Sequence, residues 1–151
     1  MSRLIAAVAL LVLAACAGGE RYRDPAVPMH AVAEVDLARY AGRWFEIARF
    51  PVSFQRGCTD VTADYALRED GRVDVLNTCL RNGRRVEAAA IARSVDPSNA
   101  KLKVRFSNLL PFEGDYWVIF LDEDYETAVV GVPSGGAGWI LARTPEIPAE
   151  R

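Results

Sequence analysis

The side chains of this sequence that could carry chemistry are few: three cysteines, the single histidine His30, and the carboxylate pair Asp122 and Asp124. His30 lies in a stretch rich in glycine, proline and charge, and no His/Cys cluster has the spacing of metal ligands. The sequence also lacks G-x-S-x-G, H-E-x-x-H and glycine-rich phosphate-loop motifs. Asp122 and Asp124 stand in a predicted turn, where solvation accounts for both. We therefore expect no enzyme, no metal site and no cofactor.

The cysteine with the clearest chemistry is Cys16, which lies near the end of an apolar run. The run is unbroken over residues 4–17 and follows the positively charged Arg3. It is shorter than the roughly 20 residues that span a bilayer, but it is typical of the hydrophobic part of a secretory signal peptide. Ordinary secretion with cleavage near Ala15 and a buried apolar helix are both compatible with such a run.

Residues 13–16, Leu-Ala-Ala-Cys, resemble the lipobox of bacterial lipoproteins. The resemblance implies that residues 1–15 are a signal peptide, that a diacylglyceryl group is attached to the Cys16 thiol, and that the new amine is acylated. Several acyl chains on one residue form a stable membrane anchor. Ala17 and Gly18 follow the cysteine, and similarity to enterobacterial sorting then implies the outer membrane, with the protein facing the periplasm.

Residues 16–33 are predicted to be the lipidated end and a tether. This stretch contains glycines, prolines and charges and shows neither helical nor strand periodicity. The folded domain is expected over residues 34–151.

The composition of the chain excludes several classes of protein. Its 151 residues are 51% hydrophobic, with 18 Lys+Arg, 20 Asp+Glu and a net charge of −2. These values exclude intrinsic disorder, a collagen-like repeat and a polytopic membrane protein. They also give no electrostatic reason to expect a nucleic-acid partner.

Most of the remaining sequence has the two-residue periodicity of β-strands. Turn signals such as Asp70-Gly71 and Asn82-Gly83 separate the runs. A helical turn is expected over residues 35–42, with Asp36 as its N-cap and Gly42 as its stop. The predicted strands are 44–50, 59–67, 73–79, 85–95, 101–106, 115–121, 127–132 and 139–143. Eight antiparallel strands in sequence predict an all-β fold, an up-and-down β-barrel with space for one small ligand, and a β-sandwich is the alternative.

Three motifs, in order along the chain, resemble those of the lipocalin family. Gly42-Arg43-Trp44 is similar to the G-x-W signature of the family. Asp122-Glu123-Asp124-Tyr125 is similar to its second motif, although Leu121 stands where that motif begins with threonine. The third motif is a basic residue that ends the last strand, here Arg143. The resemblance is nearest to the bacterial outer-membrane lipocalins and apolipoprotein D.

The resemblance implies structural roles rather than ligand contacts for Gly42, Trp44, Asp122, Tyr125 and Arg143. In lipocalins the tryptophan closes the floor of the barrel and the arginine packs across it, a contact that contributes about 0.5–2 kcal/mol. Lipocalins also continue after the third motif into a long helix, which we expect to be missing because the sequence ends at Arg151. The wall that this helix would cover is then exposed, which is compatible with a homodimer, with a membrane contact or with a less stable domain.

Cys58 and Cys79 flank the predicted hairpin that turns near Asp70. An even pair of cysteines in an oxidising periplasm is expected to form a disulfide. A loop of about 20 residues closed in this way contributes roughly 3 kcal/mol on the chain-entropy model. Simple hairpin pairing leaves the two positions out of register, so the bond requires a bulge or a cysteine in a loop that curls back. Two free thiols are the alternative.

Strand alternation from an inward-facing Trp44 predicts the inner wall of the barrel. The residues expected to contact a ligand are Val61, Ala63, Tyr65, Val75, Asn77, Leu102, Val104, Phe106, Tyr116, Val118 and Trp139. In residues 115–121 the inward choice of Tyr116, Val118 and Phe120 is open, because the intervening residues are equally apolar. An apolar wall with a few polar side chains suits a lipid or other amphiphile, and a packed core is the alternative.

Two features near the expected open end of the barrel have more than one interpretation. The apolar stretch 106–112 could be a lid, a surface that touches membrane or a patch for a partner. A set of basic residues either attracts an anionic head group or is a solvated surface: Arg49, Arg56, Arg81, Arg84 and Arg85.

The sequence therefore predicts a lipid-anchored lipocalin that binds a fatty acid, a lysophospholipid or a similar amphiphile in the cell envelope, for storage, transport or membrane maintenance. The alternative is a structural or interaction lipoprotein whose barrel is filled by its own side chains.

Overall fold

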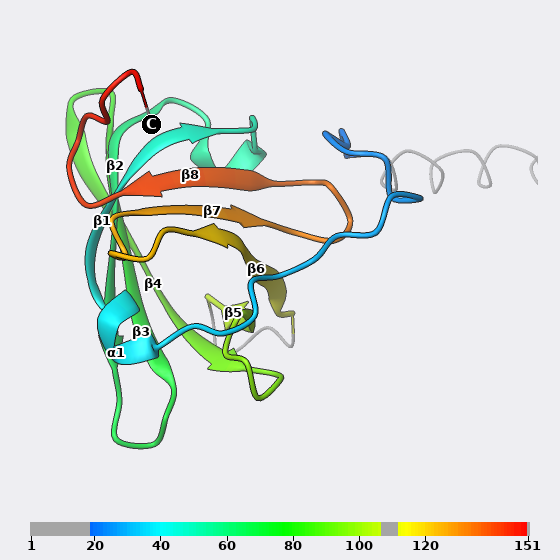
Figure 1. The fold of residues 1–151 in the computed structure, drawn as a ribbon. Coiled ribbons are helices and arrows are strands. Elements are labelled where there is room, and N and C mark those ends of the chain that lie inside the picture. Colours follow the sequence, from blue (N-terminus) through cyan, green and yellow to red (C-terminus); the bar gives the residue numbers. More distant parts are fainter. Residues whose placement is uncertain (1–18, 107–111, 151) are drawn as a thin grey trace, which may run out of the picture.

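The fold is a closed barrel of antiparallel strands, seen in a computed structural model that describes residues 19–106 and 112–150 (Figure 1). Cys16 and residues 107–111, to which predictions were attached, lie outside the described residues.

Short connections join the strands in the order of the sequence. The elements are α1 (Leu37–Tyr40), β1 (Gly42–Arg49), the 3-10 turn η1 (Ser53–Gln55), β2 (Cys58–Leu67), β3 (Val73–Arg81), β4 (Arg84–Ser94), β5 (Lys101–Arg105), β6 (Gly114–Leu121), β7 (Thr127–Gly131) and β8 (Gly138–Ala142). Each strand pairs with the next and β8 pairs with β1, so the sheet closes without a free edge. The predicted all-β barrel is confirmed and the β-sandwich is excluded.

Helix α1 lies at one end of the barrel, which we call the closed end. The Asp36 side chain caps the helix by accepting hydrogen bonds from the backbone N–H groups of Ala38 and Arg39, at 2.9 and 3.2 Å. Gly42 does not stop this helix but begins β1 with a φ of +98°, which favours glycine. A Cβ atom at Gly42 would also lie 3.2 Å from Nη1 of Arg143.

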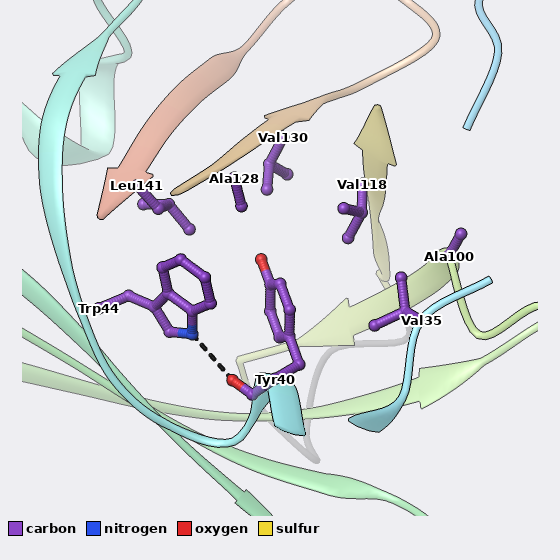
Figure 2. Packing of buried hydrophobic residues seen from close by; sticks show 8 residues of the cluster. All are labelled: Val35, Tyr40, Trp44, Ala100, Val118, Ala128, Val130 and Leu141. Carbon is purple, nitrogen blue, oxygen red and sulfur yellow. Dashed lines mark hydrogen bonds between the residues drawn. The ribbon is translucent and has the colours of Figure 1, made fainter. Parts of the chain in front are cut away.

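The main apolar cluster fills the closed end of the barrel (Figure 2). Trp44 is fully buried there, and its indole Nε1–H donates to the carbonyl of Tyr40 at 2.8 Å. The other buried members are Val35, Tyr40, Ala100, Val118, Ala128, Val130 and Leu141. A second cluster on β3, β4 and β5 continues the wall and consists of Val73, Val75, Ala90, Ala92 and Leu102.

The prediction that Phe120 faces inward is wrong. Strand β6 carries an irregularity between Val118 and Phe120 in its pairing with β7. A one-residue slip of this kind moves the following side chains to the opposite face. Phe120 is consequently 49% exposed, whereas Leu121 packs against the closed-end cluster.

The described part of the predicted tether, residues 19–33, has no helix or strand but lies along the barrel wall (blue in Figure 1). Val32 N–H donates to the carbonyl of Val118 on β6, at 2.9 Å. At the other end of the barrel, Tyr22 N–H donates to the carbonyl of Gly135 at 2.8 Å, and the Tyr22 ring stacks on Phe50 at 4.5 Å. These contacts fix the path of the segment from the closed end to the opposite end.

Candidate functional site

The barrel encloses a cavity of about 860 Å³. This volume lies in the range of sites that bury a whole small ligand. Its wall is mainly apolar, with side chains from β2, β3, β4, β5, β6 and β8 and from helix α1. The barrel is therefore hollow rather than filled by its own side chains.

The cavity opens at the end opposite α1. Its lining residues from the closed end, such as Val35 and Tyr40, are buried, and the buried Trp44 ring packs against Tyr40 with 4.9 Å between the ring centres. The exposed lining side chains all come from the other end, where the loops between β1 and β2, β3 and β4, β5 and β6, and β7 and β8 meet. A ligand therefore enters between these four loops, which we call the open end.

All of the predicted ligand contacts except Ala63 lie on the cavity wall: Val61, Tyr65, Val75, Asn77, Leu102, Val104, Phe106, Tyr116, Val118 and Trp139. Ala63 is buried on the same face of β2, but it pairs with Trp44 of β1 and lies beside that side chain.

Three tyrosine hydroxyls meet deep in the cavity. The Tyr116 hydroxyl lies 2.8 Å from that of Tyr40 and 3.0 Å from that of Tyr65. Three O–H groups joined by two hydrogen bonds leave one proton that the cluster does not use, and a ligand oxygen or a water molecule can accept it. Burial raises the pKa of all three hydroxyls, to about 12 for Tyr65, so the cluster is uncharged at neutral pH.

A second polar network joins the loop between β1 and β2 to the wall near the open end. The indole N–H of Trp139 donates to the Gln55 side-chain oxygen at 2.8 Å, and the Gln55 amide donates to Glu46 at 2.7 Å. Glu46, whose side chain is 7% exposed, also pairs with Arg49 at 2.7 Å. The polar groups of Trp139, Gln55, Glu46 and Arg49 bond to one another, and because Gln55 belongs to η1 the network holds η1 on the barrel.

The predicted basic set separates into different environments. Arg49 is bound in the network of Glu46, and Arg85 pairs with Glu87 at 2.8 Å. Arg81 lines the cavity; one of its terminal N–H groups donates to the Phe54 carbonyl at 2.8 Å, while its Nε has no hydrogen-bond partner among the described residues. Arg56 and Arg84 are exposed and form no ion pair within the part of the chain that the structure describes.

The predicted disulfide between Cys58 and Cys79 is confirmed, with 5.5 Å between the Cα atoms. An irregularity between Thr59 and Thr62, where Asp60 has a φ of +50°, shifts the register of β2 against β3 and pairs Cys58 with Arg81. This shift supplies the bulge that simple hairpin pairing lacked. Both cysteines line the cavity near its open end.

The motif residues lie at the closed end. The Arg143 guanidinium lies 3.9 Å from the centre of the Trp44 ring and donates to the carbonyls of Arg39, Arg43 and Tyr125 at 2.8–3.1 Å. Asp122 accepts hydrogen bonds from the backbone of the loop between β6 and β7, and the Tyr125 hydroxyl accepts one from Asp36 N–H at 3.0 Å. These contacts tie α1, β1 and β8 together under the cavity.

The described residues contain no group of three or more His, Cys, Asp and Glu that could hold a metal ion. In the same residues no helix has the length and apolar character needed to cross a membrane.

Sequence reasoning missed several residues of the site. Glu46 lies two residues after Trp44 on the same face of β1, so alternation extended along this strand would have found it. Tyr40 joins the hydroxyl cluster from α1 and Gln55 reaches the network from η1. Their sequence neighbourhood gives no signal for either contact, because both depend on how a short turn packs on the barrel.

Comparison with known proteins agrees with this architecture. The family described as a lipocalin-like domain matches residues 35–151. The chain is 42% identical over 130 residues to temperature-induced lipocalin-1 of Arabidopsis thaliana, covering 81% of this chain and 70% of that protein. It is 39% identical over 148 residues to the outer membrane lipoprotein Blc of Escherichia coli, covering 96% and 80% of the two chains. Insecticyanin of the tobacco hornworm Manduca sexta has the same fold, with a TM-score of 0.66, 19% identity and coverage of 82% and 71%.

Proposed function

The chain belongs to the lipocalin family, and on that premise we propose that it is a lipid-anchored carrier that holds a fatty acid or a lysophospholipid in the bacterial cell envelope. The observation that carries this proposal is the apolar cavity of about 860 Å³, open at one end. Lipocalins are generally binding and transport proteins rather than enzymes, which agrees with the absence of catalytic motifs.

Burial of the acyl chain supplies the binding energy. Each CH₂ group transferred from water contributes about 0.8 kcal/mol. The wall that the acyl chain contacts includes Val75, Leu102 and Val104. The tyrosine hydroxyls below these residues are uncharged, so an apolar ligand meets no charged group there. A polar head group remains at the open end, where Arg81 lines the cavity.

The anchor keeps the carrier near its source of ligand. Cys16 is the residue that carries the acyl chains in this proposal, and Ala17 and Gly18 favour the outer membrane. The outer membrane lipoprotein Blc of Escherichia coli matches 96% of this chain, which supports the same location.

A displacement titration with a fluorescent fatty acid tests the carrier function. We expect saturable 1:1 binding by the full mature chain bearing Cys16→Ser, which keeps the protein in solution. Val104→Arg places a charge on the cavity wall and should weaken binding tenfold or more, the equivalent of about 1.4 kcal/mol. Ala88→Trp fills part of the cavity without adding charge and should also weaken it.

Lys103→Arg is the matched control, because it adds the same guanidinium on the outer face of β5, where Lys103 pairs with Asp115 at 2.7 Å. Its affinity should equal that of the parent chain. Absence of saturable binding, or equal affinity of the parent, Val104→Arg and Ala88→Trp, would favour the structural lipoprotein instead.

A further inference from the structure

The described chain begins beside the opening of the cavity. Gly19 shares a groove with Phe54 and Arg56 of the loop between β1 and β2 and with Ser134 of the loop between β7 and β8. Arg23 holds the segment there through a hydrogen bond of 2.6 Å to the carbonyl of Pro133. Gly19 follows Cys16 by three positions in the sequence, and three steps of extended chain span at most about 11 Å. An anchor on Cys16 therefore holds the open end, not the closed end, within about one nanometre of the bilayer surface.

Exposed apolar side chains surround the same opening. Phe112 is 75% exposed, Phe54 62% and Phe106 53%, although each also lines the cavity. They come from two loops, and Val86 of β4 joins them. Aromatic rings at the mouth of a site expose apolar area to water, which is costly unless another apolar phase covers them.

Charge is distributed unevenly between the two ends of the barrel. Arg56 and Arg84 are exposed and form no ion pair among the described residues. Arg56 shares a groove with Phe54, and Arg84 begins β4 at the hairpin of the open end, where it pairs with Arg81. The closed end instead presents the acidic loop between β6 and β7, which contains Asp122, Glu123, Asp124 and Glu126. An anionic surface attracts the first end and repels the second, and each basic residue near such a surface contributes about 1 kcal/mol.

We propose that the rim, defined as Phe54, Val86, Phe106 and Phe112 with Arg56 and Arg84, docks on an anionic phospholipid bilayer. The rings enter the interface and the guanidinium groups contact lipid phosphates, so the cavity opens directly onto the membrane. An acyl chain then passes between bilayer and barrel without crossing water. This inference rests on the proposed anchor at Cys16 for its orientation and gives the proposed carrier its loading route.

Fluorescence quenching by brominated phospholipids tests the orientation. The mature chain is attached to vesicles of phosphatidylglycerol and phosphatidylcholine through Cys16, by its own acyl chains or, where these are lacking, by a maleimide phospholipid on the thiol. Phe112→Trp places a reporter on the rim, and Leu67→Trp places a matched one at the closed end, where Leu67 is 43% exposed. Quenching of the three native tryptophans is measured on the parent chain and subtracted.

We expect at least threefold more added quenching for Phe112→Trp than for Leu67→Trp. This difference should shrink when Arg56→Gln and Arg84→Gln are combined with Phe112→Trp, and when phosphatidylglycerol is omitted. Equal quenching of the two reporters, or stronger quenching of Leu67→Trp, overturns the inference. Equal quenching of Phe112→Trp on neutral and anionic vesicles overturns its electrostatic part.

The outcome is separable from the carrier function. The maleimide attachment does not require natural lipidation, and the fatty-acid titration does not require a vesicle. If the protein binds fatty acid but the two reporters are quenched equally, only the proposed docking surface is contradicted. If the two reporters differ in quenching as expected but the protein binds no fatty acid, only the proposed carrier function is contradicted.

Discussion

The residues that decide the chemistry of the cavity are tyrosines. The Tyr116 hydroxyl forms hydrogen bonds with those of Tyr40 and Tyr65. The three tyrosines come from β6, α1 and β2, and none of them is charged at neutral pH. The closed end below them depends on one arginine. The Arg143 guanidinium covers the Trp44 ring and donates several hydrogen bonds to backbone carbonyls, a geometry that a lysine side chain does not reproduce. A few polar groups thus fix the floor of the apolar cavity.

Protein stability should fall as the pH rises from 10 to 12. An unfolded tyrosine ionises near its ordinary pKa of 10.0, whereas burial raises the pKa of Tyr65 to about 12, so only the unfolded state loses the proton in this window. The stabilising contribution is complete below pH 10 and is lost as the pH passes through 12, with a magnitude on the order of 2 kcal/mol for Tyr65. Urea unfolding at pH 9 and pH 11.5 measures it.

The control for this prediction is the variant Tyr65→Phe, which lacks the ionisable hydroxyl. Its free energy of unfolding should fall less between pH 9 and pH 11.5 than that of the parent chain. The same pH dependence in both proteins would show that Tyr65 ionises equally in the folded and unfolded states.

At the scale of elements, local irregularities determine where strands present their side chains. The slip in β6 turns Phe120 out of the barrel, and the one in β2 changes the residue that faces Cys58. The disulfide then ties β2 to β3 beside the loop that carries η1, and the Arg81 side chain bridges from β3 to the carbonyl of Phe54. Covalent and polar contacts in this way hold the open end together.

Removal of the disulfide should destabilise the barrel. The double variant Cys58→Ala, Cys79→Ala frees a loop with a sequence separation of 21, and the chain-entropy model predicts a loss of about 3 kcal/mol in the free energy of unfolding. Denaturant unfolding of the oxidised parent and of the variant measures the difference.

Reductant provides the internal control for the disulfide. It should lower the stability of the parent to near that of the double variant and leave the variant unchanged. Equal stability of the parent and the variant under oxidising conditions would mean that the native contacts alone hold the open end.

At the scale of the whole molecule, the path of the N-terminal segment relates the proposed anchor to the cavity. The segment runs along β6 from α1 to the open end and ends beside the hairpin of β7 and β8 (Figure 1). A tether of the same length without these contacts would let the barrel tumble freely relative to the membrane. In a chain anchored at Cys16, as proposed above, the packed segment would limit which end of the barrel can approach the bilayer.

Cys16→Ser should abolish the membrane anchor without affecting the fold. Because the full-length variant would keep the apolar signal peptide as an unlipidated precursor, it is expressed from residue 16 onward. This chain should move from the detergent phase to the aqueous phase in a phase-partitioning experiment, because two or more acyl chains supply the apolar area that binds the membrane. Its urea unfolding curve should match that of the parent. Unchanged partitioning into detergent would contradict lipidation at Cys16.

The sequence by itself determined the fold and most of the cavity wall, because both depend on local patterns. Two-residue alternation fixes which side chains of a strand face inward, and turn residues fix where strands end. Val75, Leu102 and Val104 could therefore be assigned to the wall without knowledge of their neighbours. The resemblance of Gly42, Trp44 and Arg143 to lipocalin motifs likewise indicated the closed end.

Only the tertiary structure decided the properties that depend on distant segments meeting. Whether the barrel is hollow depends on the volume left between its facing walls. This volume cannot be predicted from the pattern of any single strand. The slip in β6, the contact of Gln55 with Trp139 and the packing of Tyr22 on Phe50 each join residues from different elements. Periodicity is a property of one strand, whereas a cavity and its orientation arise from the closure of all of them.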